Sequence, residues 1–385
     1  MQRVYFDNSA TTPLLPEVFE AMRPYFGERF GNASSIHHYG QETRAAVERA
    51  REQVAALLGC RASEIVFTSG GTEADNLAIF GIASAGDHVV TSTVEHHAVL
   101  NACKHLESQG VSVTYLPVDG QGRIDPDDIR RALQSSTRLI TIMTANNETG
   151  VVQDIAAIGK IAAEADVRFH TDAVQAVGKV PLDVKALGCD LLSLSGHKVH
   201  APQGVGALYV RKGTALHPML YGGRHERSRR AGTENVPGIV GLGKAAELAS
   251  SCLSNTPKST LDMRNRLEGA LRRVESSGVN GDGAPRVPQT LSMYFDSVEG
   301  EALVIALDLK GLAVSTGAAC SSGAIEPSHV LTAMGLGAER ARASIRFSLG
   351  QQNTMEEVEF AIALVGETVP RLRELSPLWG NRMRA

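Results

Sequence analysis

The chain has 385 residues, 43% hydrophobic and 21% charged, and its 38 basic and 42 acidic residues leave a formal net charge of −4. This composition is typical of a folded globular protein, not of a disordered chain, and the length suits roughly two or three domains. Because no basic excess is present, nothing indicates binding to nucleic acid or to an anionic membrane.

The N-terminal stretch MQRVYFDNSATTP lacks an apolar core of signal-peptide length, and no segment resembles a transmembrane helix. The five cysteines, at positions 60, 103, 189, 252 and 320, are never closer than 43 positions. An odd, scattered set is typical neither of a disulfide framework nor of a zinc site. We therefore expect a cytoplasmic protein with reduced thiols and no intrinsic metal.

Helix and strand patterns alternate from about residue 40 to residue 212. Residues 41–59 place Val47, Val54 and Leu58 on one face and stop at Gly59, which predicts a helix with a glycine C-cap. Short β-rich runs follow, separated for the most part by helical stretches such as 98–110 and 154–166. The predicted strands are 64–69, 87–92, 111–118, 138–144, 167–172 and 190–195. This alternation favours a mainly parallel sheet with helices on both faces.

After about residue 250 the pattern changes to that of a smaller α+β domain. Its predicted strands are VPQTLSMYF (287–295), LAVSTG (312–317) and ASIRFSLG (343–350). In parallel sheets ligands bind beyond the carboxyl ends of the strands, so polar residues that directly follow strands are the candidates for a site.

Two such segments are suited to an anion and to a ring nitrogen. In FTSGGTEADN a strand ends in Gly70, Gly71 and Thr72 as a helix begins, and free backbone N–H groups there suit a phosphate. An ordinary tight turn explains the same residues equally well, and no Walker motif is present. In FHTDAVQAVG, Asp172 and Gln175 suit a heteroaromatic ring and its hydroxyl, although an isolated Asp at this position is commonly a helix cap.

Two further segments supply a lysine and histidines. In SGHK, Ser195 and His197 precede Lys198, and in STVEHHAVLN, His96 and His97 follow a strand. Most lysines are solvated surface charges, and a lone histidine at a helix start is commonly structural. Taken together, however, the four segments match pyridoxal phosphate, which needs a lysine for its Schiff base, a carboxylate for its ring nitrogen and a phosphate cradle.

The chain resembles the cysteine desulfurases, in the branch that serves nitrogen fixation and iron–sulfur cluster assembly. The motifs that carry the resemblance run in order along nearly the whole chain: YFDNSATTP, GNASSIHHYG, TSGGTEADNLAI, VEHHAVL, NNETGVVQDI, HTDAVQAVGK, SLSGHKVHAPQGVGALYVR, RRAGTENV, STGAACSSGAIEPSHVL and SIRFSLG. The resemblance implies an α/β fold of pyridoxal-phosphate fold type I. It implies a large domain, 15–250, with a mainly parallel sheet of the seven-stranded type, and a small α+β domain made of 1–14 and 251–385, which carries the catalytic cysteine loop.

The resemblance also implies a role for each matching residue. Lys198 is the Schiff-base lysine and a proton carrier, Asp172 pairs with the ring nitrogen, Gln175 contacts the ring hydroxyl, and His96 stacks on the ring and assists proton transfer. The phosphate is bound by Gly71, Thr72, Ser195, His197 and, from the other subunit of a homodimer, Thr233. Asn147 contacts the cofactor and, with Arg346, holds the substrate carboxylate.

Cys320, in STGAACSSGA, decides the reaction. Small polar neighbours suit an exposed loop better than a core, although a free cysteine is often just a small buried hydrophobe. The resemblance implies that its thiolate takes the sulfur of L-cysteine as a persulfide, releases alanine, and serves an iron–sulfur scaffold or another sulfur acceptor. On this basis Cys320 could also ligate a transferred cluster.

Two alternatives stay open. Another fold-type I enzyme, such as an aminotransferase or a cysteine or selenocysteine lyase, would use Lys198 but would have no need of Cys320. A non-enzymatic sulfur carrier would leave the pairing of Lys198 with Asp172 unexplained.

Overall fold

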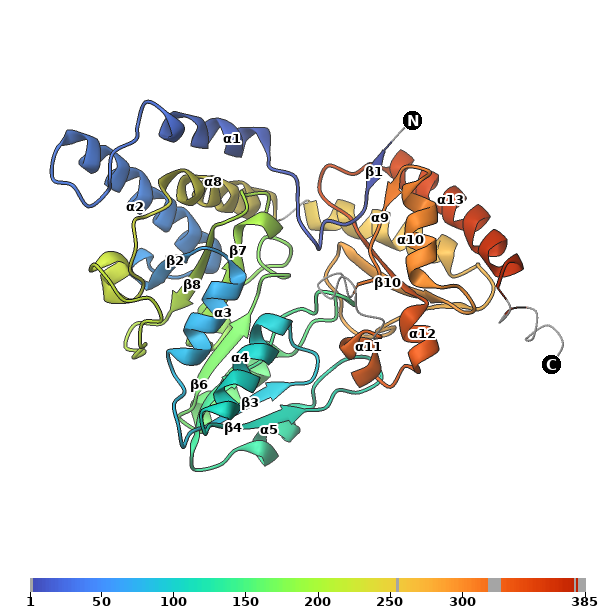
Figure 1. Ribbon diagram of the computed structural model, residues 1–385, viewed down its shortest axis with the longest axis horizontal. Helices are drawn as coiled ribbons and strands as arrows, with labels where there is room; N and C mark the ends of the chain where they lie inside the picture. The colour runs from blue at the N-terminus through green and yellow to red at the C-terminus, as the bar shows by residue number, and fades with distance from the viewer. Residues whose placement is uncertain (1–2, 254–255, 318–326, 377–378, 380–385) are drawn as a thin grey trace.

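The computed structural model describes residues 3–253, 256–317, 327–376 and 379. A seven-stranded sheet forms the larger part of the molecule, in the order β2-β8-β7-β6-β5-β3-β4 (Figure 1). Its strands are β2 (Ile65–Thr68), β3 (His88–Ser92), β4 (Ser112–Leu116), β5 (Thr137–Thr141), β6 (Arg168–Asp172), β7 (Leu191–Ser195) and β8 (Gly206–Val210). Only β8 runs antiparallel to its neighbours, β2 and β7. The predicted mainly parallel α/β sheet is confirmed, but β8, inside the stretch around Lys198, was not predicted.

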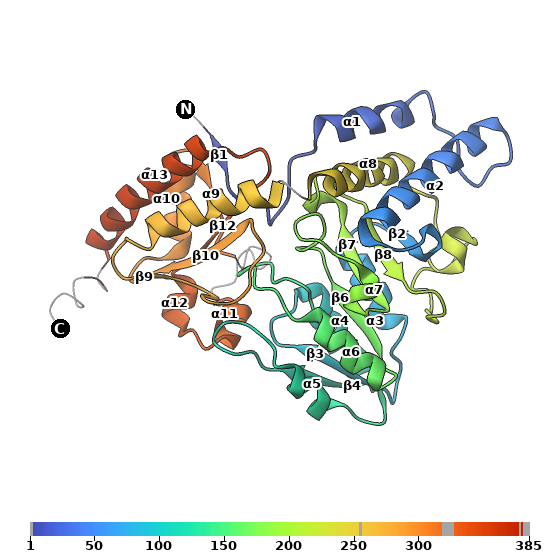
Figure 2. The same cartoon turned by 180° about the vertical axis from the view of Figure 1, so that it is seen from behind.

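Helices cover both faces of this sheet, because its strands bury apolar side chains on both sides. Along β2, Ile65 and Phe67 join the large core beside α2 (His38–Leu58), α6 (Ile155–Glu164) and α8 (Val236–Cys252). Val66 points the other way, into a cluster with α3 (Gly71–Phe80), and β3 and α4 (His97–Ser108) extend that second face. Figure 1 shows α3 and α4 on the near side, and Figure 2 shows α6 and α7 (Val184–Leu187) on the other.

The predicted helix at 41–59 is confirmed as α2. It ends at Gly59, which has the left-handed φ of 70° that glycine adopts without steric cost. The other helical elements of the larger part are α1 (Pro16–Met22), α5 (Pro126–Ala132), η1 (Arg23–Phe26), η2 (Ala62–Glu64), η3 (Gly196–Lys198) and η4 (His225–Ser228).

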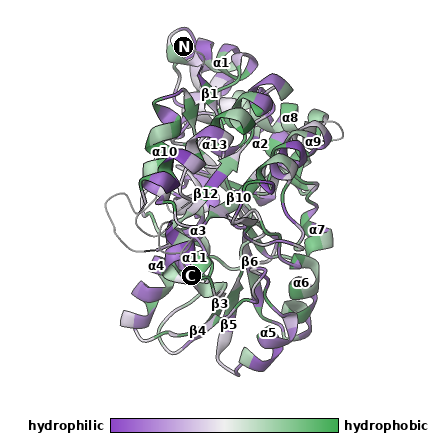
Figure 3. Ribbon diagram, turned by 90° about the vertical axis from the view of Figure 1, so that its right-hand side faces the viewer, coloured by the Kyte–Doolittle hydropathy of each residue, from purple (hydrophilic) through white to green (hydrophobic). Residues whose placement is uncertain are grey.

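A second core surrounds a three-stranded antiparallel sheet of order β12-β10-β9. Its elements are β9 (Ser277–Val279), β10 (Thr290–Phe295), β12 (Ser344–Ser348), α9 (Thr256–Leu271), α10 (Gly300–Asp308) and α13 (Met355–Glu374). The helices α11 (His329–Ala333) and α12 (Ala338–Arg342) instead form a separate apolar cluster with Val94. In Figure 3, α10 and α13 mix hydrophilic and hydrophobic colours, as expected for helices with one packed face.

The N-terminal segment belongs to this second core. Strand β1 (Val4–Tyr5) pairs in parallel with β11 (Leu312–Ala313), and Phe6 is fully buried there before the chain crosses to α1 (Figure 1). The predicted strand 312–317 is shorter than expected, because beyond Ala313 only Ser315 forms an isolated bridge, with Arg346. The division into domains of 15–250 and of 1–14 with 251–385 stays a prediction. Within the described residues, no helix is long and apolar enough to cross a membrane.

Candidate active site

The carboxyl edge of the large sheet holds a cavity of about 400 Å³. Asp172 and Ser195 are the last residues of β6 and β7, Gly71 begins α3 directly after β2, and His96 is the N-cap of α4 after β3. The cavity is lined by the predicted residues Gly71, Thr72, His96, Asn147, Asp172, Gln175, Ser195, His197 and Lys198. Residues spread over 128 positions of the chain therefore meet because parallel strands end at one edge.

Lys198 extends from η3, the short helical turn that follows β7. Its Nζ donates to the backbone carbonyl oxygens of Ser9 and Ala10, at 2.6 and 2.5 Å. The N-terminal segment that crosses between the two cores thus holds the amine beside the cavity. A solvated surface lysine would not have two main-chain partners, so this geometry favours a functional lysine.

Asp172 lines the cavity, and only 6% of its surface is exposed. Burial raises its pKa to about 6, although the N–H of Val174, which donates to Oδ1 at 2.9 Å, and the charge of Lys198 both oppose the shift. Val174 lies only two residues later, so the carboxylate caps its own turn and also faces the cavity. The helix-cap interpretation and the functional one are both compatible with this contact.

The start of α3 forms a cradle that excludes side chains. A Cβ on Gly71 would lie 2.8 Å from Cγ2 of Val174 and 3.4 Å from Cβ of Ser195, so only glycine fits without displacement. Thr72 and Ser195 contribute hydroxyls here, and the helix N-terminus contributes N–H groups. This donor set suits a phosphate.

Two histidines border the cradle as neutral imidazoles. Burial, with the charge of Lys198 second, lowers the pKa of both His96 and His197 to about 4. The Nδ1 of His96 accepts a hydrogen bond from the Ala98 N–H at 3.1 Å. Its ring proton is therefore on Nε2, from which it can donate a hydrogen bond to a neighbouring group.

Arg346, on β12 of the smaller sheet, comes to the same region with 3% of its surface exposed. Its Nη1 donates to the carbonyl oxygen of Asn147 at 2.7 Å, and its Nη2 donates to Oδ1 of Asp7 at 2.8 Å. The guanidinium is thereby held in one orientation. A planar fork of this kind is suited to a carboxylate.

Two predicted residues that the structure describes, Arg346 and Thr233, are not among those that line the cavity. Thr233 is exposed. Cys320 lies outside the described residues.

Sequence reasoning missed Asp7, Ser9 and Ala10, although the motif YFDNSATTP that contains them was recognised. It also missed Asp75 and Glu95, buried carboxyls whose pKa values are raised first by burial and then by the charge of Asp172. The sequence signal for these two carboxyls was their position, since Asp75 lies three residues after Thr72 and Glu95 directly precedes His96. The sequence does not show, however, that a carboxyl is buried.

The sequence profile of the aminotransferase class-V family matches residues 4–360. The chain is 52% identical, over 99% of its length and 95% of the relative, to "Cysteine desulfurase IscS" of Methanosarcina thermophila. It is also 52% identical, over 98% of its length and 95% of the relative, to "Cysteine desulfurase" of Trichormus azollae.

Two solved structures superpose on most of the chain. One described as a NifS-like protein superposes with a TM-score of 0.90 at 37% identity, covering 96% of this chain and all of that one. A second, "SspA in complex with cysteine", gives a TM-score of 0.80 at 38% identity over 91% of this chain and 99% of the other.

Proposed function

Since this chain belongs to the aminotransferase class-V family and is a cysteine desulfurase, we propose that it uses pyridoxal 5′-phosphate to convert L-cysteine to L-alanine and keeps the sulfur as a persulfide on Cys320. One observation carries this proposal: Lys198, Asp172 and a glycine-lined cradle of phosphate-type donors border a single cavity.

The residues present fit the cofactor. Lys198 would bear its aldehyde carbon, Asp172 would accept from its ring nitrogen, and Gln175 and Asn147 would contact the ring hydroxyl and its surroundings. Gly71, Thr72, Ser195 and His197 would hold the phosphate, in the cradle that a Cβ on Gly71 would fill. When bound, pyridoxal phosphate supplies a ring that takes up the electron pair left when an amino acid loses its α-proton.

The protein's own groups then do the positioning and the proton transfers. Arg346 and Asn147 hold the carboxylate of L-cysteine, and the Lys198 amine takes up and returns the α-proton. His96, neutral and with its proton on Nε2, can donate a hydrogen bond to the substrate sulfur. Because Asp172 is buried and faces Lys198, its carboxylate favours a protonated ring nitrogen.

Sulfur transfer requires the thiolate of Cys320. An S–S bond forms between Cys320 Sγ and the substrate sulfur while the substrate C–S bond breaks. The electron pair of that bond stays on carbon, which is protonated to give the methyl group of alanine. Cysteine and enzyme thiol thus yield alanine and enzyme persulfide, with no external oxidant.

We propose a homodimer in which Thr233 of one subunit completes the phosphate site of the other. Exposed apolar side chains support an interface near α1 and α2: Phe26, Phe30 and Ile36 are 67%, 71% and 89% exposed.

The persulfide would pass to an iron–sulfur scaffold or another sulfur acceptor in the cytoplasm. The thiols of Cys60, Cys103, Cys189 and Cys252 are free, which supports a reducing compartment.

The test is incubation of the purified, cofactor-loaded protein with L-cysteine and a reductant, with alanine and sulfide measured together. Equal amounts of both are expected, and pyruvate with ammonia would instead indicate a lyase. Mass spectrometry after brief exposure to L-cysteine should place an extra sulfur on the peptide that contains Cys320. Cys320→Ser should bind the cofactor and form no persulfide, whereas Cys60→Ser, at a partly exposed cysteine, should behave as wild type. Alanine formation at the wild-type rate by Cys320→Ser would refute the desulfurase mechanism.

A further inference from the structure

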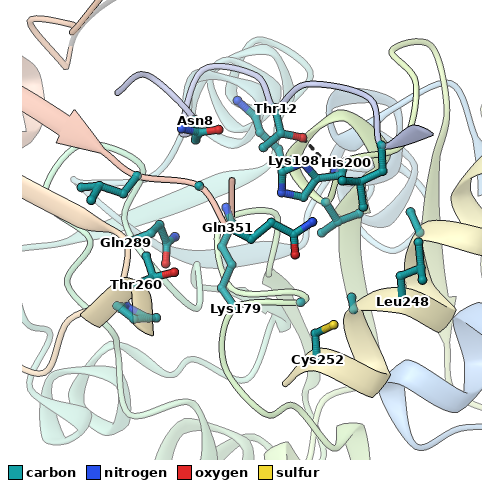
Figure 4. Close-up of a pocket in the computed structure, with 18 residues that line it drawn as sticks. Asn8, Thr12, Lys179, Lys198, His200, Leu248, Cys252, Thr260, Gln289 and Gln351 are labelled. Atoms are coloured by element: carbon teal, nitrogen blue, oxygen red, sulfur yellow. Dashed lines mark hydrogen bonds between the residues drawn. The ribbon is translucent and has the colours of Figure 1, made fainter. Parts of the chain in front are cut away.

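A second cavity, of about 70 Å³, lies beside the first, and Lys198 borders both. Lys179, a residue to which sequence reasoning assigned no role, reaches up through the middle of this second cavity, below Lys198 (Figure 4). Burial, with the charges of Lys198 and Arg346 next, lowers the pKa of Lys179 to about 7. Such a position for a lysine is costly, and an apolar residue would avoid that cost.

The contacts of Lys179 lead directly to the cofactor cavity. Its Nζ donates to Oε1 of Gln175 at 3.1 Å, and Nε2 of Gln175 donates to the carbonyl oxygen of Ser9 at 3.0 Å. That same carbonyl accepts the Nζ of Lys198 at 2.6 Å. Lys179 is thus connected to Lys198 through one amide and one carbonyl.

This arrangement determines which end of the Gln175 amide faces the site. A lysine nitrogen that donates to Oε1 and a carbonyl that accepts from Nε2 require the same orientation of the amide. Without Lys179 the oxygen would lose its only charged donor among the described contacts of Gln175. With only the Ser9 carbonyl left to orient it, the amide would present its oxygen to the ring hydroxyl for part of the time.

We propose that Lys179 is a positioning residue, which holds the Gln175 amide with its NH₂ group toward the ring oxygen of the cofactor. The proposal rests on the proposed function, since it takes Gln175 to contact that oxygen. The other charged groups and histidines near Lys179 are Lys198, Arg346, His197 and His200, and the Cys252 thiol lines the same cavity. None of these groups is a carboxylate, so none of them favours the protonated form of Lys179.

The readout is the pH at which the visible absorption of the cofactor-loaded protein changes, which reports a proton held by the chromophore. A hydrogen-bond donor to the ring oxygen disfavours the protonated form. Lys179→Met, which removes the donor that orients the amide, should therefore raise this midpoint by about 1 pH unit. Lys179→Arg, which keeps charge and donor, should stay close to wild type, and the exposed-site control Lys185→Met should be unchanged.

A double-mutant cycle separates positioning from a purely structural or direct electrostatic role. If Lys179 acts through Gln175, Gln175→Ala should raise the midpoint, and adding Lys179→Met should change it little further. An unchanged midpoint in folded Lys179→Met, or shifts that add fully in the double variant, would overturn the proposal. If Lys179→Met does not fold, Lys179→Gln, which keeps a donor without the charge, should leave the midpoint close to wild type, while Gln175→Ala should raise it. Alanine formation by the wild type tests the proposed function separately.

Discussion

Lys198 acquires its special position from two main-chain carbonyls. The oxygens of Ser9 and Ala10 accept its Nζ, so the amine is held at the cavity instead of moving freely in solvent. The local sequence SGHK only determines that the lysine follows a strand. Its reactivity depends on a segment nearly 190 positions away.

The first prediction concerns this amine. Lys198→Ala should lower steady-state alanine formation by at least about 10²-fold, the usual contribution of a general acid–base group. Lys198→Arg should be equally inactive, because a guanidinium keeps the charge but does not condense with an aldehyde. Both variants should still bind pyridoxal phosphate through Thr72, Ser195 and His197. The matched control, Lys185→Ala, changes an exposed lysine, and near-normal turnover by Lys198→Ala would remove Lys198 from the mechanism.

Glu95 provides a prediction on the pH dependence of stability. It is fully buried, and burial raises its pKa from 4.5 to about 8, even though the Ser92 hydroxyl and the Met143 N–H donate to it. Between those pH values the folded protein holds a proton that the unfolded chain has lost. Stability therefore falls as the pH rises through this window, with a slope of at most about 1.4 kcal/mol per pH unit from this group.

In Glu95→Gln this contribution is absent. The urea midpoint of the variant should decline less steeply than that of the wild type between pH 5 and pH 8. Glu52→Gln, at an exposed position, serves as the control and should follow the wild type. Parallel curves for wild type and Glu95→Gln would show that Glu95 does not retain its proton in the folded state.

At the scale of elements, the turn from β2 into α3 combines close packing with anion binding. The helix starts without a side-chain cap, so its first N–H groups are available to a ligand, and Gly71 lets the backbone approach Ser195 and Val174. Valine has one strongly preferred rotamer, so it does not yield easily to a new Cβ.

Gly71→Ala should therefore lower stability by about 1–3 kcal/mol, the usual cost of overpacking, and weaken binding of pyridoxal phosphate. Gly269→Ala is the matched control, because a Cβ there meets nothing within 4 Å on an exposed position of α9. In a helix interior that change should stabilise by roughly 0.5–1 kcal/mol. Urea midpoints and cofactor titrations measure both effects, and equal behaviour of the two variants would contradict a steric requirement at Gly71.

At the scale of the whole molecule, the loop that precedes α8 lies next to the phosphate cradle. Arg230 donates to both carboxylate oxygens of Glu73, in the first turn of α3, at 2.7 and 3.2 Å. Thr233 nevertheless stays exposed. This combination suits a residue that completes a site across a dimer interface.

Mixed dimers test this arrangement. Thr233→Ala should weaken cofactor binding by roughly 10- to 100-fold, because a hydrogen bond to a charged group contributes about 1.5–3 kcal/mol. If Thr233 acts on the partner, a dimer of one Lys198→Ala chain and one Thr233→Ala chain contains one intact site. If it acts within its own chain, the same dimer contains none. Cofactor retained after dialysis, and alanine formed per mixed dimer, distinguish the two.

Much of the fold could be predicted from the amino-acid sequence because hydrophobic periodicity and capping residues are local features. The periodicity of 41–59 and its terminal glycine predicted α2, and six apolar runs predicted strands of the large sheet. Strand β8 was missed because GALYV lies directly after a loop rich in proline and glycine, and its antiparallel direction follows from pairing with β2 and β7.

The chemistry of the site was also indicated by sequence alone, since residue types and motif order along the chain point to a lysine, a carboxylate and a phosphate cradle. What only the tertiary structure decided is how these groups are held. The carbonyls of Ser9 and Ala10 reach Lys198, Asp7 orients Arg346, and Lys179 orients Gln175. The pKa values of Glu95, His96 and Asp172 likewise depend on burial, which the folded chain alone creates. Contacts and burial of this kind join residues far apart in the chain, and no local pattern encodes the distance between them.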